Sequence, residues 1–188
     1  MPRAERERQM LTVAEEIFAE RGYRDTSMDD IAERVGVSKP MIYEYFGSKE
    51  GLLVACIRAA RAELLAATVE SVDGAGSAEE ALRRGLVTFF EFVDSRRRSW
   101  KLIQAEATVA GQHAVDEIEA VRQQQTAVNV TLFASFLPDL PHRELEAYAE
   151  IVVGACERLA TWYVHHDVSA SDAAESVMRL VWFGLRPH

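Results

Sequence analysis

The chain has 188 residues, of which 48% are hydrophobic and 27% are charged. This length and composition allow one medium domain, or a small domain joined to a larger one, with a buried core, and they exclude an intrinsically disordered chain. The formal net charge of −9 excludes a protein that coats nucleic acid regardless of its sequence, so any DNA binding has to come from a local surface.

The sequence predicts no membrane-directed segment. No segment approaches the roughly 20 uninterrupted apolar residues that a bilayer crossing needs, so we expect no membrane partner. The first eight residues, Met-Pro-Arg-Ala-Glu-Arg-Glu-Arg, lack the apolar centre of a secretory signal, and we expect a cytoplasmic protein. Cys56 and Cys156 each sit in an apolar helical pattern, which predicts two buried thiols rather than a disulfide.

Apolar residues recur at helical spacing almost from end to end, and no run of β-branched residues alternates with period two. The sequence therefore predicts an all-α fold. The first helix ends at Gly22, which suits a left-handed position after a helix. The segment Thr26-Ser27-Met28-Asp29 is typical of a capping box, in which Thr26 and Asp29 start the second helix.

Further helix starts follow along the chain. Gly36 makes a tight turn, Ser38 caps a short third helix, and Pro40 fits the first turn because N–H groups there have no intrahelical partner. Ser48 caps a long fourth helix, and a second capping box starts at Ser77 after the glycine-rich linker 73–76. We predict later helices at about 77–94, 97–110, 114–137, 142–166 and 170–185, with a break at the prolines of 138–141.

Two short helices joined by a glycine-containing turn, with another helix behind them, form a helix-turn-helix unit, and residues 27–46 fit this order. The string VGVSKPMIYEYFGSKEGLL at 35–53 makes the signal specific, together with AEEIFAERGY at 14–23 and TSMDDIA at 26–32. These segments closely resemble the DNA-binding domain of the TetR (tetracycline-repressor) family of transcriptional regulators. The resemblance implies a helix-turn-helix DNA-binding domain at 1–50 and a helical effector-binding and dimerisation domain at 51–188.

The second helix of such a unit enters the major groove of DNA. Lys39, Met41 and Tyr43 lie on or near its outward face, where a lysine can bond guanine and the other two can contact a thymine methyl or a phosphate. The resemblance implies phosphate contacts by Thr26, Tyr45 and Lys49. The predicted DNA-binding residues are Thr26, Ser38, Lys39, Pro40, Met41, Tyr43, Tyr45 and Lys49.

Several of these assignments have a structural alternative. Tyr43 is either a DNA contact or a core residue, and Tyr45 either binds phosphate or braces the unit. Glu44 either accepts from a cytosine amino group or faces away from DNA. Arginines ahead of the first helix either reach DNA as a flexible arm or belong to a solvated helix face; they are Arg3, Arg6 and Arg8.

The resemblance implies that residues 142–185 pair with a second copy of the chain as a four-helix bundle. The apolar seams from Leu145 to Tyr163 and from Ala173 to Gly184 favour lengthwise helix packing, although a seam inside one subunit has the same pattern. The resemblance also implies a small-molecule effector among the middle helices. The candidate pocket residues are Phe89, Phe92, Val93, Trp100, Ile103, Thr108, His113, Phe133 and Trp162, each of which is alternatively a plain core residue.

The leading hypothesis is a sequence-specific DNA-binding regulator, a repressor that a small molecule releases from a palindromic double-stranded operator. One rival is a helical protein-interaction or small-molecule-binding protein whose DNA-binding unit has decayed. Four residues argue against this rival: Lys39, Tyr43, Tyr45 and Lys49. The other rival is a helical-bundle enzyme, but the sequence has no phosphate-binding loop and no Glu-x-x-His pair. We expect no enzymatic activity, no cofactor and no metal, and we interpret His165-His166 as a polar helix end.

Overall fold

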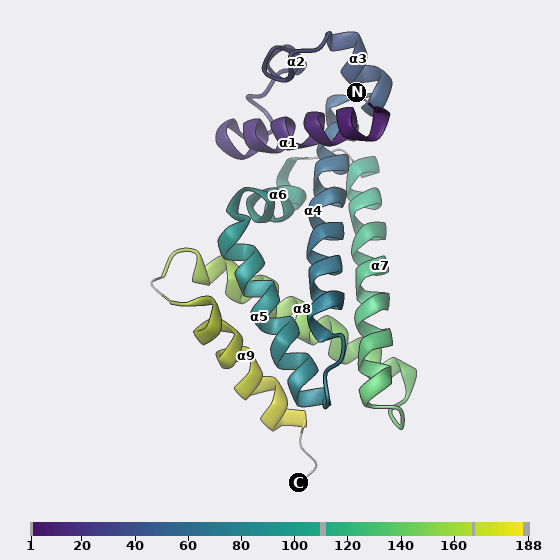
Figure 1. Ribbon diagram of the computed structural model, residues 1–188, viewed down its shortest axis with the longest axis vertical. Helices are drawn as coiled ribbons and strands as arrows, with labels where there is room; N and C mark the ends of the chain where they lie inside the picture. Colours follow the sequence, from purple (N-terminus) through teal and green to yellow (C-terminus); the bar gives the residue numbers. More distant parts are fainter. Residues whose placement is uncertain (1, 110–111, 167, 186–188) are drawn as a thin grey trace. The chain divides into compact units, whose positions relative to one another are not determined.

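The prediction of an all-α fold is confirmed. This computed structural model describes residues 2–109, 112–166 and 168–185, and it describes the backbone alone at 105–109, 112–114, 117–118, 121, 125 and 183–185. Within these residues the chain forms α-helices and no strand (Figure 1). The helices are α1 (Arg3–Arg21), α2 (Met28–Val35), α3 (Lys39–Phe46), α4 (Lys49–Val72), α5 (Ala78–Ser95), α6 (Arg97–Val109), α7 (Gln112–Phe136), α8 (His142–Tyr163) and α9 (Ala170–Leu185).

Tertiary contacts divide the chain into two compact units. The first unit is Met1–Ala62 with Arg97–Val121, and the second unit is Glu63–Arg96 with Arg122–His188. The first unit extends beyond residue 50 because α6 returns to pack on α1, where Lys101 Nζ donates to the Ala19 carbonyl at 2.7 Å. The functional boundary at residue 50 stays a prediction.

The core of the first unit joins α1, α2, α3 and the start of α4. Ile42 of α3 is fully buried in this core, and Phe46 packs against its edge. Burying a side chain of this size stabilises a fold by about 1.5–3 kcal/mol, so Ile42 fixes the rotation of α3 about its axis. Other buried members are Met10, Ala14, Ile17, Phe18, Ile31, Val35, Leu52, Cys56, Ile57 and Leu102.

The start of α2 corrects the sequence prediction by one residue. Ser27, not Thr26, caps the helix: its side chain accepts from the Asp30 N–H at 3.1 Å, and the Asp30 carboxylate accepts from the Ser27 N–H at 3.0 Å. Two hydroxyl-bearing residues and two aspartates stand side by side here, so the sequence fits either register. Gly36 ends α2 with φ 77°, a conformation that other residues adopt only under strain.

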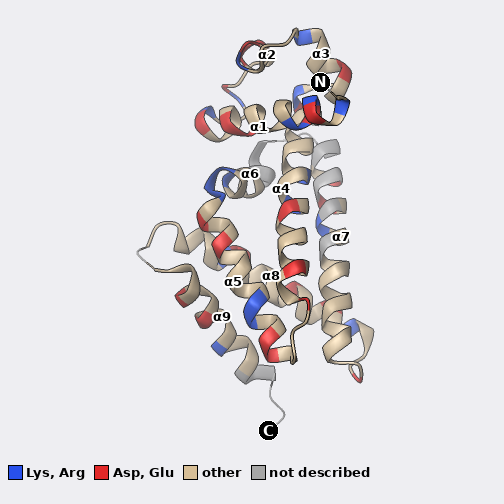
Figure 2. Ribbon diagram, viewed as in Figure 1, with Lys and Arg blue, Asp and Glu red and all other residues tan. Residues whose placement is uncertain are grey.

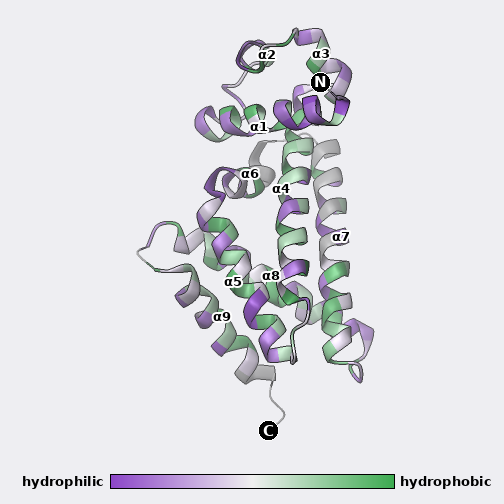
Figure 3. Cartoon of the chain, in the orientation of Figure 1, coloured by the Kyte–Doolittle hydropathy of each residue, from purple (hydrophilic) through white to green (hydrophobic). Residues whose placement is uncertain are grey.

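Helix α4 is apolar along much of its length (Figure 3). It starts as predicted behind Ser48, whose hydroxyl accepts from the Gly51 N–H at 2.9 Å. None of the helices in the described part of the chain has both the length and the apolarity that a membrane crossing needs.

The second unit packs α5 against α8 and α9. Phe90 of α5 is fully buried, with its ring 5.8 Å from that of Tyr163 at the end of α8. Arg83 of α5 forms an ion pair with Glu175 of α9. A second ion pair joins α7 to α8, with Arg122 Nη2 3.0 Å from Glu157 Oε2. Much of the apolar seam of α8 is buried within the single chain. Its buried members are Leu145, Ala149, Cys156 and Tyr163.

Candidate nucleic-acid interface

Helix α3 presents an exposed arc opposite its buried residues. At 3.6 residues per turn, this arc runs about 200° around the helix, from Lys39 and Tyr43 at one edge, past Pro40, to Met41 at the other. Tyr43 is 41% exposed and Met41 is 36% exposed, whereas Ile42 is fully buried. The alternative in which Tyr43 is a core residue is therefore wrong.

The first residue of α3 is held by the helix before it. Lys39 Nζ lies 2.8 Å from Asp29 Oδ2, and both side chains are solvent-accessible. The hydrogen bond to Asp29 raises the pKa of Lys39, so the ammonium stays charged. Ser38 occupies the N-cap position without a side-chain hydrogen bond to the helix.

Lys49 at the start of α4 is positioned by the loop that precedes α2. Its ammonium nitrogen lies 4.4 Å from the centre of the Tyr23 ring, a cation–π contact, and donates to the Arg24 carbonyl at 3.4 Å. Burial and the neighbouring Glu50 carboxylate raise the pKa of Tyr23, so its phenol stays neutral. A cation at a helix N-terminus, beside free N–H groups, suits a phosphate contact.

Tyr45 packs at the edge of the first unit's core, and the Arg3 guanidinium carbon lies 4.8 Å from the centre of its ring. Arg3, Arg6 and Arg8 all lie within α1, so of the two alternatives the structure favours a helix face over a flexible arm. The sequence did not separate these possibilities, since arginines that alternate with glutamates suit both an arm and an exposed helical turn.

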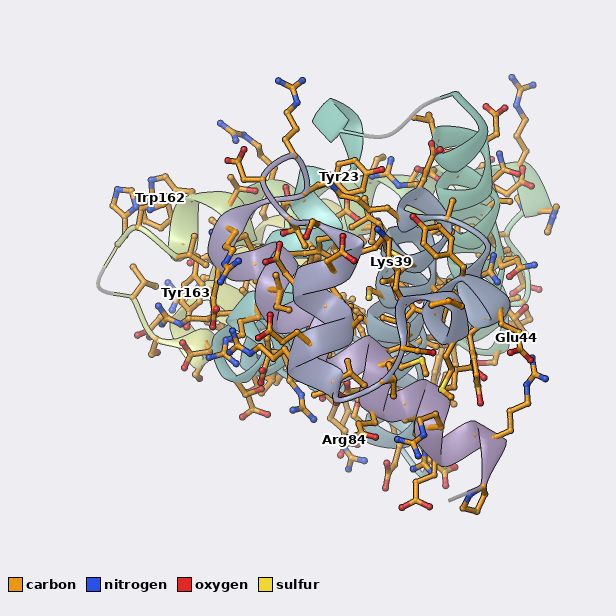
Figure 4. The ribbon with its side chains drawn as sticks, turned by 90° about the horizontal axis from the view of Figure 1, so that it is seen from above. Tyr23, Lys39, Glu44, Arg84, Trp162 and Tyr163 are labelled. Atoms are coloured by element: carbon orange, nitrogen blue, oxygen red, sulfur yellow. The ribbon has the colours of Figure 1, made fainter. Side chains whose placement is uncertain are left out.

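The structure also places Thr26 and Glu44, the first in the interior of the first unit and the second on the exposed arc of α3. Thr26 is 2% exposed, and its hydroxyl donates to the Gly22 carbonyl at 2.7 Å, so it braces the loop before α2. Glu44 is exposed, about 140° around α3 from Lys39, and Figure 4 shows the two side chains well separated. Glu44 lies only about 40° from Pro40, so it shares the exposed arc and does not turn into the core.

Comparison with known proteins agrees with this geometry. Residues 10–56 match the family model described as bacterial regulatory proteins, tetR family, and residues 78–184 match the tetracyclin repressor-like C-terminal domain. The chain belongs to the TetR family. A TetR-like transcriptional regulator from Rhodococcus sp. RHA1 is 35% identical, with a TM-score of 0.76 and 98% of each chain covered.

Two curated relatives in mycobacteria regulate transcription with opposite sign. The HTH-type transcriptional activator FasR of Mycolicibacterium smegmatis is 26% identical over 98% of this chain and 85% of its own length. The HTH-type transcriptional repressor KstR2 of Mycobacterium tuberculosis is 30% identical over 70% of each chain. This TetR-family chain is accordingly a DNA-binding transcriptional regulator and not an enzyme.

A solved structure of another transcriptional regulator shows the same fold with a ligand. The regulator FadR of Bacillus subtilis in complex with stearoyl-CoA has a TM-score of 0.83 at 19% identity, with 95% of this chain and 99% of that chain covered.

The predicted effector residues of this TetR-family chain are divided between the two units. Trp100 and Ile103 lie buried in the first unit, and Phe133 packs near Leu145 in the second. Trp162 is 45% exposed and stacks on His166, with ring centres 3.9 Å apart. Phe89, Phe92 and Val93 do lie together on α5 in the second unit, whereas the side chains of Thr108 and His113 lie outside the described residues.

Helices α8 and α9 carry large apolar side chains that the chain itself leaves in water. Ile151 is 60% exposed and Leu180 is 75% exposed. Ile151 and Trp162 are eleven residues apart, which places them within about 20° on one side of α8. Ile151 was not predicted from the sequence, and Leu180 was predicted only as part of a seam, although an apolar residue off a buried seam is the signal for a second face.

Proposed function

We propose that α3 reads an operator sequence in the major groove of double-stranded DNA. The observation that carries this proposal is the exposed arc of α3, which offers Lys39, Met41 and Tyr43 to a partner while Ile42 anchors the helix. Lys39 bonds guanine O6 and N7, and the two larger side chains contact thymine methyl groups or phosphates. Lys49 and the partly buried Tyr45 hold the flanking backbone.

Selection from random duplex DNA tests this proposal directly. The wild-type chain is expected to enrich one sequence, and a pool that stays random would refute base reading. If the DNA-binding domain ends at residue 50, as proposed, substitutions beyond residue 50 are expected to change the affinity for DNA but not the selected consensus sequence.

Two lysine variants separate base reading from phosphate anchoring. Lys39→Ala is expected to cost about 1–3 kcal/mol on the operator and little on random duplex. Lys49→Ala is expected to weaken both and to reduce the salt slope by about 0.9 for each lost phosphate contact. Arg58→Ala, a change at an exposed arginine of α4 outside residues 142–185, serves as the matched control. Equal losses on both duplexes for Lys39→Ala would remove Lys39 from the base-reading set.

We propose further that the chain acts as a homodimer through residues 142–185. The exposed Ile151, Trp162 and Leu180 support this arrangement, because a second copy removes them from water. A twofold dimer carries two equivalent α3 helices, so the selected operator is expected to be an inverted repeat. A consensus without twofold symmetry would contradict the dimer as the DNA-binding form.

We propose that a small molecule binds in the second unit and releases the chain from its operator. The chain would then act as a repressor, and we propose that it does so in the cytoplasm. Support comes from the fold shared with FadR of Bacillus subtilis, which holds stearoyl-CoA. The test titrates the operator complex with stearoyl-CoA, with free stearate and with coenzyme A as separate arms. Release of the operator by one of these compounds, lost in Phe92→Ala but kept in Val69→Ala, would support an effector site on α5. If none of the three compounds releases the operator, this ligand class is excluded.

A further inference from the structure

An ion pair joins the two helices of the helix-turn-helix unit at the start of α3. Lys39 is the first residue of α3, and Asp29 is the second residue of α2. The Nζ to Oδ2 distance of 2.8 Å is that of a charge-assisted hydrogen bond. The Lys39 side chain is 43% exposed and that of Asp29 is 72% exposed, so the pair lies at the surface that α3 offers to DNA.

Helix electrostatics explain why this pair forms. A helix N-terminus carries a partial positive charge, which favours Asp29 in the first turn of α2 and disfavours Lys39 in the first turn of α3. The Asp29 carboxylate offsets that unfavourable placement. In the absence of DNA, the ammonium therefore pairs with Asp29, which directs it along the edge of the exposed arc.

We propose that Asp29 is a positioning residue that restrains Lys39 and thereby weakens binding to DNA that lacks the operator. The inference rests on the proposed reading of DNA by α3. A phosphate that approaches Lys39 meets the Asp29 carboxylate beside it, and the two anions repel each other. A base edge meets no such penalty, because guanine O6 and N7 are neutral acceptors.

The chemistry of the ammonium group allows both partners at once. It has three N–H donors, so one bond to Asp29 leaves two for guanine O6 and N7. Asp29 therefore stays in place on the operator and aims Lys39 at the base edge. On other sequences, a phosphate that binds Lys39 lies beside the Asp29 carboxylate, and the repulsion between the two anions weakens that contact.

The experiment compares affinities for the selected operator and for a random duplex across a salt series. Asp29→Asn keeps the shape of the side chain and removes its charge. It is expected to raise affinity for the random duplex about threefold to tenfold and affinity for the operator less than twofold, so the specificity ratio falls. The salt slope on the random duplex is expected to steepen by about 0.9 for each new phosphate contact.

Three companion variants isolate the role of Lys39. Asp29→Glu is expected to restore the wild-type ratio, and Glu33→Gln removes one exposed negative charge from the same helix as a matched control. In a Lys39→Ala background, Asp29→Asn is expected to change neither affinity. Thermal unfolding of each variant checks that the helix-turn-helix unit still folds.

The outcomes distinguish this inference from the proposed function. An equal gain on both duplexes, or a gain that persists in the Lys39→Ala background, would overturn the positioning role while operator binding stands. A wild-type chain with no sequence preference would instead overturn the proposed function and this inference with it.

Discussion

Leu180 offers the sharpest test of the proposed dimer. Complete burial of a leucine side chain is worth about 1.5–3 kcal/mol. Leu180 is 75% exposed in the single chain, so covering it contributes about 1–2 kcal/mol per subunit. A twofold interface contains the residue twice, which gives about 2–4 kcal/mol, or roughly 30-fold to 1,000-fold in the dimer dissociation constant. Leu180→Ser is expected to weaken dimerisation within this range, and Leu180→Glu is expected to give monomers because it buries an unpaired charge.

Analytical ultracentrifugation over a concentration series measures the dissociation constant. Val69→Glu makes the same kind of change at a 41% exposed residue of α4 and is the matched control. Val177 is unsuitable because it is buried within the second unit, so a charge there unfolds the chain. A dissociation constant of Leu180→Glu equal to that of the wild-type dimer would refute the interface, provided that the circular dichroism spectra also agree.

Three other measurements address the chemistry of single side chains. Cys56 and Cys156 are expected to resist a thiol reagent at pH 8 until the chain unfolds, because burial raises the pKa of both thiols, that of Cys156 to about 12; fast labelling of the folded chain would contradict this. Asp30→Asn is expected to lower the melting temperature at pH 7, because hydrogen bonds from Ser27 hold the pKa of the Asp30 carboxyl below its usual value. That difference is expected to shrink as pH falls through the lowered pKa, where the wild-type carboxyl is protonated too; a constant difference down to pH 2 would count against the cap. Glu44→Gln is expected to relax operator preference at one base pair per half-site if Glu44 accepts from a cytosine amino group, whereas a uniform gain at all positions would assign it simple repulsion.

Helix positions were predictable because local signals set them. Gly22, Ser48 and Pro138 mark ends or starts that the structure places within a residue or two of the prediction. The buried face of α3 was also predictable, since Ile42 and Phe46 are four residues apart and point to one side. Such signals depend on a few neighbouring residues and survive without tertiary information.

Features that depend on distant contacts were not predictable in the same way. The family resemblance implied that Thr26 binds phosphate, yet in the folded loop its hydroxyl donates to the Gly22 carbonyl. The pairing of Lys39 with Asp29 joins residues ten positions apart on different helices, and no periodic pattern connects them. The return of α6 to α1 likewise depends on packing across about 80 residues of sequence, as the 2.6 Å hydrogen bond from Ser99 to Glu15 shows.

The charge pattern of the first unit is consistent with the proposed selective binding of DNA by an acidic chain. Both signs of charge mix along α1, as Figure 2 shows. Arg34 Nη1 lies 3.3 Å from Glu20 Oε2, and Arg21 Nη1 lies 3.4 Å from Asp30 Oδ1. Exposed pairs of this kind add little to stability, but they remove free cations that would otherwise attract any phosphate backbone. On the proposed reading of DNA by α3, affinity then depends on the few groups of α3 and of the start of α4, so a large background of nonspecific attraction does not mask a mismatch at those contacts.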